Sequence, residues 1–225
     1  MMPLGRLYAN GEGVAQNYTK AREWWEKAAD KGDATAMLYL GRLYYNGHGV
    51  AHDYAKAREW FEKAADKGNT DALASLARLS IREASEAGRH DEALQLQEAL
   101  AAKVEAVDTE REGKPGEETA RALNEVAWRA LFAREFTKAL TVADRSHALF
   151  PDDLSIESKR AHVLMFIGQD EEAKALYLAH KGKVSEWSGG KLWEQIVTDD
   201  FAKLGKAGLT HPMMADIEKE LGVSP

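Results

Sequence analysis

The chain has 225 residues, of which 44% are hydrophobic and 30% charged, and its formal net charge is −7. This composition is sufficient for a hydrophobic core, and the excess of acidic residues argues against a nucleic-acid-binding surface, which needs clustered Lys and Arg. The absence of cysteine excludes disulfides, thiolate metal sites and a cysteine nucleophile.

The sequence gives no sign of a membrane or export signal. It contains no run of 18 apolar residues, and its first residues lack the charged-then-apolar pattern of a signal peptide. We therefore expect a cytoplasmic protein that does not enter a membrane. The alternative is a longer native chain with an upstream signal peptide.

A repeat opens the chain. Residues 4–33 read LGRLYANGEGVAQNYTKAREWWEKAADKGD, and residues 40–69 read LGRLYYNGHGVAHDYAKAREWFEKAADKGN, at an offset of 36 residues. Fixed periods of about 20–50 residues are typical of proteins built from stacked repeats.

Each copy predicts two helices. In the second copy, Asp33 can cap a first helix and Gly47 can end it, because glycine accepts the left-handed conformation after a last turn. Asp53 can cap a second helix that closes at Gly68. The predicted buried residues of the first helix are Ala36, Met37, Leu40, Leu43 and Tyr44, and those of the second are Tyr54, Ala57, Trp60, Phe61, Ala64 and Ala65.

These residues resemble a known family. The pattern LGxLYxNGxGV…DYxKAxEWxEKAADKG is similar to the Sel1-like repeat, a relative of the tetratricopeptide repeat (TPR) with a longer loop between its helices. The resemblance covers residues 1 to about 75 and implies stacked antiparallel helix pairs from a bacterial protein. Trp24, Trp60 and Trp193 stand at repeat-consensus or amphipathic-face positions, so we expect them to pack in the core, and Trp25 aligns with Phe61, which indicates the same packed slot.

Residues 76–187 keep the helix-pair pattern with a different period. The segments that begin at Asp91, Thr137 and Glu171 resemble second helices of TPRs, and Ala139 and Ala173 are 34 residues apart, which is the TPR period. The distance from Ala93 to Ala139 is 12 residues too long. We assign the surplus to an insertion near 103–116, which reads as a charged helix extension and a Gly-Lys-Pro-Gly turn.

Residues 188–225 differ from the repeats and predict a C-terminal helical cap. Residues 184–190 read as a loop, and residues 191–208 as an amphipathic helix that buries Leu192, Ile196, Phe201 and Leu204. Residues 210–222 predict a last helix with Pro212 in its first turn and Gly222 at its end. The expected fold is therefore an all-α solenoid of stacked antiparallel helix pairs, Sel1-like and then TPR-like, closed by this cap.

Nothing in the chain predicts catalysis, a metal or a cofactor. His48 and His52 are four residues apart, but the first copy has Glu12 and Gln16 there, so we interpret them as solvated loop residues. Asp199 and Asp200 are adjacent on a helix and point about 100° apart, so they do not converge on one substrate. We interpret this acidic pair as a solvated face.

The TPR resemblance also implies binding residues, because particular positions of each first helix line the concave groove. Counting back from Ala93, Ala139 and Ala173 gives the candidate partner-binding residues Arg78, Arg82, Arg121, Asn124, Trp128, Ser158 and His162. In such a groove, arginine would bind carboxylates, Asn124 would pair with peptide amides and Trp128 would pack an apolar side chain. Trp128 could equally be buried, and the arginines could pair with acids of the chain such as Glu83 and Glu125.

We therefore expect a non-enzymatic interaction scaffold for a peptide or partner domain that is not a nucleic acid. One alternative is a regulatory arm of a larger bacterial enzyme, for example a caspase-like one, because Met1 aligns with Met37 and the first helix begins midway through its unit. Another is a self-assembling module, a homo-oligomer formed through Leu4, Leu7 and Tyr8 of the uncapped first repeat.

Overall fold

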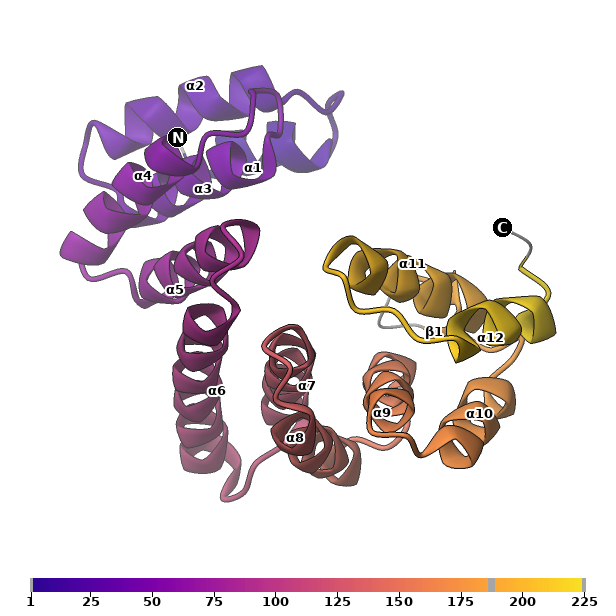
Figure 1. Ribbon diagram of the computed structural model, residues 1–225. Helices are drawn as coiled ribbons and strands as arrows, with labels where there is room; N and C mark the ends of the chain where they lie inside the picture. The colour runs from indigo at the N-terminus through magenta and orange to yellow at the C-terminus, as the bar shows by residue number, and fades with distance from the viewer. Residues whose placement is uncertain (1, 186–188, 224–225) are drawn as a thin grey trace. The chain divides into compact units, whose positions relative to one another are not determined.

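The computed structural model describes residues 2–185 and 189–223, with the side chains of residues 2 and 70 left aside, and over these ranges it contains twelve helices and one two-stranded β-ladder (Figure 1). The helices pack in sequential antiparallel pairs, which confirms the predicted fold class. Two compact units divide the chain: Met1–Glu86, called unit 1, and Ala87–Pro225, called unit 2.

Unit 1 contains five helices: α1 (Met2–Asn10), α2 (Tyr18–Ala29), α3 (Ala34–Asn46), α4 (Tyr54–Asp66) and α5 (Thr70–Glu86). Each helix packs against the next along the chain. The predicted domain boundary at residue 75 lies inside α5, which is one continuous helix. The two compact units are divided after Glu86.

The predicted caps of the second repeat are present. The carboxylate of Asp33 accepts hydrogen bonds from the backbone N–H groups of Thr35 and Ala36, and that of Asp53 accepts one from the N–H of Lys56. Gly47 follows α3 with φ 68° in the left-handed region. These contacts fix where each helix begins and ends. The capping residues identified from the repeat pattern therefore predicted where α3 begins and ends and where α4 begins.

The glycine of each Leu-Gly pair leaves room for an aromatic ring of the second helix. A Cβ atom on Gly41 would lie 2.4 Å from the ring of Phe61, and one on Gly5 would lie 2.2 Å from the indole nitrogen of Trp25. Phe61 is 1% exposed and Trp25 is 4% exposed. The structure thus confirms that the two aromatic residues fill equivalent slots, and shows that glycine is what opens them.

Trp24 and Trp60 differ from this pattern, because they are only half-buried. The ammonium group of Lys27 lies over Trp24, 4.9 Å from the ring centroid, and that of Lys63 lies over Trp60 at 4.5 Å. The predicted core packing is therefore wrong for Trp24, whereas Trp60 packs against the hydrophobic core of unit 1 while partly exposed. A cation lies over each of the two rings. At the start of the unit, Leu4 is 40% exposed.

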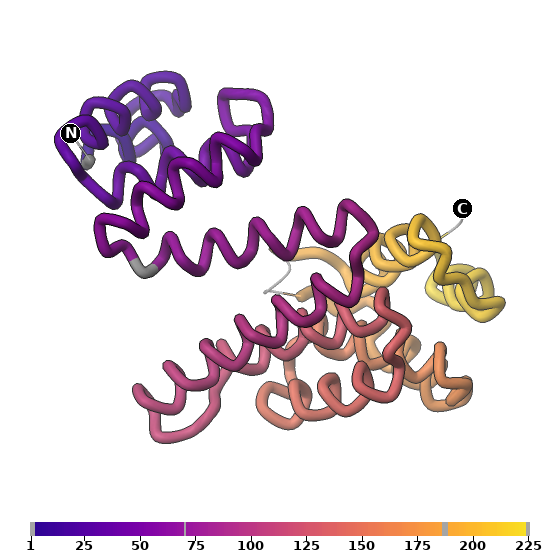
Figure 2. Tube along the Cα trace, turned by 60° about the vertical axis from the view of Figure 1, so that its left-hand side comes forward, coloured from indigo at the N-terminus to yellow at the C-terminus, as the bar shows by residue number. Residues whose placement is uncertain are grey.

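Unit 2 begins with four helices: α6 (His90–Glu112), α7 (Glu117–Phe132), α8 (Phe136–Leu149) and α9 (Leu154–Phe166). It continues with α10 (Asp170–Ala179), β1 (Val184–Ser185), β2 (Lys191–Leu192), α11 (Trp193–Lys206) and α12 (Met213–Leu221). Figure 2 shows α7 returning alongside α6 after a tight turn. None of the described helices is both long and apolar enough to cross a membrane.

The long α6 helix provides the cap for the next helix. Gly116 precedes α7 and has no side chain to cap it, so Asp108 of α6 accepts hydrogen bonds from the backbone N–H groups of Gly116 and Thr119 and from the Thr119 hydroxyl. The Thr119 hydroxyl is the main cause that holds the pKa of the Asp108 carboxyl below its usual value. The residues near 103–116 therefore extend α6 and anchor the start of α7.

The C-terminal helices form as the pattern indicated, with two differences. Ile196, Phe201 and Leu204 of α11 are buried, but Leu192 precedes the helix and is 40% exposed. The segment 184–190 is not wholly a loop, because Val184 and Ser185 pair antiparallel with Leu192 and Lys191. The middle of that predicted loop, residues 186–188, lies outside the described residues.

Candidate binding site

The seven residues predicted to line a groove lie on three helices, α5 in unit 1 and α7 and α9 in unit 2. On α7, Asn124 is 5% exposed and donates to the backbone oxygen and hydroxyl of Ser155 at 3.4 Å. Arg121 forms an ion pair with Glu117. On α9, Ser158 and His162 are 0% exposed, so they face the interior of unit 2. Partner binding by these residues stays a prediction.

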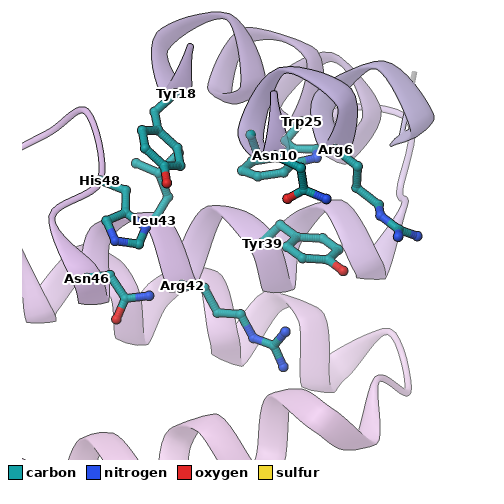
Figure 3. A pocket seen from close by; sticks show the side chains of 10 residues that line it. Arg6, Asn10, Tyr18, Trp25, Tyr39, Arg42, Leu43, Asn46 and His48 are labelled. Carbon is teal, nitrogen blue, oxygen red and sulfur yellow. The ribbon is translucent and has the colours of Figure 1, made fainter. Parts of the chain in front are cut away.

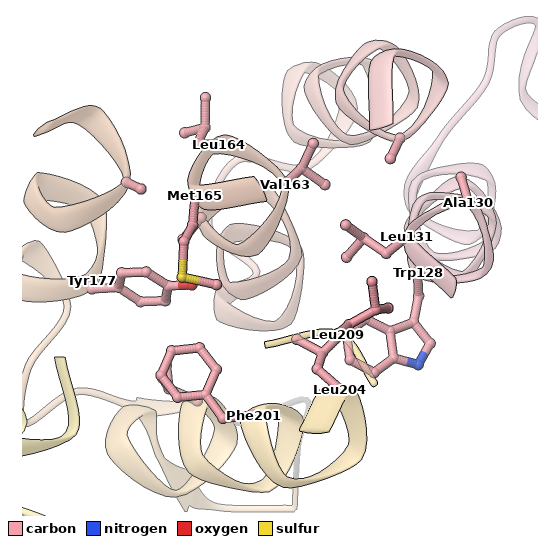
Figure 4. Packing of buried hydrophobic residues seen from close by; sticks show 14 of the residues in the cluster. Trp128, Ala130, Leu131, Val163, Leu164, Met165, Tyr177, Phe201, Leu204 and Leu209 are labelled. Atoms are coloured by element: carbon pink, nitrogen blue, oxygen red, sulfur yellow. The ribbon is translucent and has the colours of Figure 1, made fainter. Parts of the chain in front are cut away.

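Helix α11 covers the side of unit 2 on which Trp128, Ser158 and His162 lie. Phe201, Leu204 and the following Leu209 pack in one hydrophobic cluster with Trp128, and Figure 4 shows Leu204 and Leu209 beside its indole ring. Trp128 is 8% exposed. The position at which a groove would accept an apolar side chain of a partner is thus taken by the chain's own C-terminal segment.

A buried ion pair links α9 and α11 at the same contact. The carboxylate of Asp200 on α11 accepts a hydrogen bond from Lys159 of α9 at 2.9 Å and another from Lys203 at 2.9 Å. Asp200 is 2% exposed, so the interpretation of Asp199 and Asp200 as a solvated face is wrong for Asp200. Adjacent residues on a helix face different directions, and only Asp199 points outward, where it pairs with Lys191.

His162 completes this buried network. Its Nδ1 lies 2.6 Å from the hydroxyl of Tyr177, and its Nε2 lies 3.4 Å from the Asp200 carboxylate. Burial lowers the pKa of His162 in spite of Asp200, and burial raises the pKa of Tyr177 well above its usual value. Burial would also raise the pKa of Asp200, but the hydrogen bond from His162 and the charge of Lys159 hold it far below its usual range. Enclosed in this way, the network stabilises the contact between α9 and α11.

The lowered pKa of His162 predicts that unit 2 loses stability in mild acid. The unfolded chain binds the proton more readily, so the stabilisation is complete above the ordinary histidine pKa of about 6.5 and declines as the pH falls below it, by at most about 1.4 kcal/mol per pH unit. Urea unfolding at pH 7.5, 6.5 and 5.5 measures this slope. It should be shallower in His162→Gln than in the unaltered protein; equal slopes in the two would contradict the assignment.

The two predicted residues in unit 1 differ from each other. The guanidinium of Arg82 donates to Glu86 at 2.8 Å and lies over the rings of Tyr45 and Tyr54. The hydrogen bond to Glu86 raises its pKa. Arg78 is exposed, and it lines a hollow on the surface of unit 1.

Two hollows lie on the face of unit 1 that carries the first helices of the repeats. The first has a volume of about 310 Å³ and is lined by Arg6, Ala9, Asn10, Tyr18, Trp25, Tyr39, Arg42, Leu43, Asn46 and His48. The second has a volume of about 190 Å³ and is lined by Arg42, Tyr45, Asn46, Phe61, Ser75 and Arg78. Because Arg42 and Asn46 line both, the two hollows adjoin along α3.

Stacked aromatic rings form the walls of the first hollow. Trp25 and Tyr39 stack with their centroids 5.0 Å apart, and Tyr18 and His48 stack at 4.8 Å. Figure 3 shows Tyr39 between the side chains of Arg6 and Arg42. Aromatic faces flanked by arginines suit an extended chain with both apolar and acidic side chains.

The second hollow repeats the first at the 36-residue period. The equivalent pairs are Arg6 and Arg42, Asn10 and Asn46, Trp25 and Phe61, Tyr39 and Ser75, and Arg42 and Arg78. Of the residues that line the two hollows, the TPR positions predicted Arg78 alone, because they follow the TPR pattern and not the 36-residue period. The signal was available in the sequence, where LGRL at residues 4–7 and 40–43 recurs as LARL at residues 76–79.

The two histidines considered as a metal pair have separate partners. His48 stacks on Tyr18, whereas Nδ1 of His52 lies 3.0 Å from the backbone oxygen of Tyr45. In the described part of the chain, His, Asp and Glu side chains do not gather in groups of three or more that could hold a metal. The hollows present guanidinium and carboxamide donors beside aromatic surface.

Fold and surfaces together define an all-α helical-repeat protein of antiparallel helix pairs. Residues 2–33 and 34–69 match the family model of the Sel1 repeat, so the N-terminal part of the chain consists of two Sel1 repeats. This confirms the resemblance inferred from the sequence. Sel1 repeats are generally non-catalytic and typically form protein-interaction scaffolds.

A solved bacterial structure supports the same fold. The crystal structure of a Sel1 repeat protein from Oxalobacter formigenes aligns with a TM-score of 0.52 and 19% identity, over 98% of this chain and 84% of that one. The crystal structure of c5321, described as a protective antigen present in uropathogenic Escherichia coli strains displaying an SLR fold, aligns with a TM-score of 0.45 and 17% identity, over 98% and 52% of the two chains. No curated protein sequence matches the chain.

Proposed function

We propose that this chain is a non-enzymatic interaction scaffold whose unit 1 binds an extended peptide segment of a partner protein along α1, α3 and α5. The observation that carries the proposal is the repetition of one hollow at the repeat period, with the same residue positions presented twice. A surface that offers equivalent subsites at a fixed spacing suits a linear ligand, because successive side chains of an extended peptide can enter successive subsites.

Unit 2 has a different role in this proposal. Its α9 face is covered by α11, and the covering residues are as well buried as any core: Trp193 and Leu204 are 0% exposed. Partner binding by Trp128, Ser158 and His162 would require α11 to leave that face. Unit 1 therefore provides the binding surface, and unit 2 is a self-covered helical body.

A blocking substitution tests the proposal without any assumption about the ligand's charge. Asn46 is exposed and lines both hollows, so Asn46→Trp should fill them. A displayed library of random 12-residue peptides, selected on the full chain, should yield a motif whose affinity falls at least about tenfold in Asn46→Trp, the loss expected for a blocked peptide anchor.

The matched control is Lys67→Trp, which adds the same side chain at an exposed residue after α4. It should leave the selected motif unaffected, as measured by fluorescence anisotropy. A library that yields no motif, or a motif that binds both variants equally well, would refute peptide binding at the hollows.

A further inference from the structure

Within the part of the chain that the structure describes, the arginines of the two hollows form no ion pair with an acidic residue. Arg6, Arg42 and Arg78 occur 36 residues apart on α1, α3 and α5, and the ion pairs formed among the described residues include none of the three. Their neighbours on the second helices differ in this respect, because Arg22 pairs with Glu26 and Arg58 pairs with Glu83. Among the described residues, the arginine of the second helix of each repeat is therefore paired with an acidic residue, whereas the arginine of the first helix is not.

The hollows are positive although unit 1 as a whole is balanced. Residues 1–86 contain twelve Lys and Arg and twelve Asp and Glu, yet neither hollow has an Asp or Glu in its lining. Arg42 is held in place, since its guanidinium lies over the ring of Tyr39, 5.7 Å from the centroid. An oriented guanidinium next to an aromatic wall favours a carboxylate, which it can bind through two parallel hydrogen bonds.

We propose that the segment bound by unit 1 is acidic, with carboxylates that pair with the repeated arginines Arg6, Arg42 and Arg78. This inference rests on the proposed function and specifies the partner's chemistry. Neighbouring packed helices such as α3 and α5 are about 10 Å apart, and residues three apart in an extended chain span about 10 Å. An acidic residue at every third position therefore matches the arginine spacing.

The test uses a fluorescein-labelled 12-residue peptide with Glu at every third position in a Ser/Thr background, and the same peptide with Gln in place of Glu. We expect the Glu peptide to bind the full chain, and to bind about tenfold more weakly in 0.5 M than in 0.05 M NaCl because salt screens exposed charges. The Gln peptide should bind at least about tenfold more weakly than the Glu peptide, since it lacks the charge-assisted hydrogen bonds.

The decisive comparison is Arg42→Gln against Lys67→Gln, which remove the same charge. Arg42 lines both hollows and Lys67 lines neither, so Arg42→Gln should weaken the Glu peptide about three- to tenfold, the range of a partly exposed charged contact, whereas Lys67→Gln should not. Circular dichroism confirms that both variants fold. Equal loss in the two variants, or equal binding of the Glu and Gln peptides, would overturn the acidic assignment.

Three further outcomes show whether this inference, the proposed function or both would fail. A library motif that lacks acidic residues but is blocked by Asn46→Trp would leave the scaffold in place and refute the acidic partner. A 12-nucleotide single-stranded DNA that displaces the Glu peptide and binds more tightly in an Arg42-dependent manner would also refute it, because the arginines would then serve phosphates. Absence of binding by both the library and the Glu peptide would refute both proposals.

Discussion

Replacing Asp200 with alanine should destabilise unit 2 by about 3–5 kcal/mol, the cost of leaving a buried partner charge uncompensated. Asp200 is 2% exposed and pairs with Lys159, which is 9% exposed. Once the carboxylate is lost, Lys159 remains buried beside the ring of Trp128 without an acidic partner. Urea unfolding followed by tryptophan fluorescence measures the change in the free energy of unfolding.

The neighbouring acid is the matched control. Asp199 pairs with Lys191 at 2.6 Å, with both side chains about half exposed, so Asp199→Ala should cost no more than about 1 kcal/mol. The double variant Lys159→Met with Asp200→Leu removes both charges and should regain most of the loss, since a buried ion pair is often replaceable by apolar residues. Similar losses for Asp199→Ala and Asp200→Ala would show that Asp200 is not buried as described.

Substitution of Gly41 by alanine should destabilise unit 1 by about 1–3 kcal/mol, the usual cost of overpacking a core. The added Cβ would lie 2.4 Å from the ring of Phe61, and that residue is 1% exposed and belongs to the hydrophobic core of unit 1. The steric cost must exceed the gain of about 1 kcal/mol that alanine has over glycine within a helix. The midpoint of thermal unfolding of the full chain reports the loss for unit 1.

A second glycine gives the opposite expectation from the same substitution. Gly205 lies in α11 and is exposed, and a Cβ atom there would meet no atom within 4 Å. Gly205→Ala should therefore stabilise the protein by about 0.5–1 kcal/mol, because alanine loses less backbone freedom on folding. Stabilisation by both substitutions would mean that Phe61 moves aside, and the tight slot between α3 and α4 would not exist.

The repeats were predictable because each of their features is local in sequence. Asp33, Asp53 and Gly47 act on helix ends within a few residues of themselves, and the 36-residue period duplicates each signal. The fold class follows from these signals alone. The partial exposure of Trp60 was not predictable in this way. The period does not show that the ammonium group of Lys63 lies over the Trp60 ring.

The covered face of unit 2 depends on contacts distant in sequence. Asp200 meets Lys159 and His162 only after α11 folds back onto α9, 38 or more residues away. The helical period places Asp200, midway between Ile196 and Leu204, on the buried face of α11, but an acidic residue is more often exposed than buried, and the period does not reveal its partners. In unit 1, Arg78 was among the predicted residues, whereas Arg6 and Arg42 were not, because the 36-residue period was used to assign helices and not surface positions.

The duplication of the hollow has a consequence for how a ligand is aligned. Arg42 completes both hollows, so a segment short enough to fill one has two registers, shifted by one repeat, and can exchange between them. A segment that reaches all three arginines has one register. In the proposed complex, length would therefore select among acidic segments: a short one would exchange between the two registers, while a longer one would be held in a single alignment along unit 1.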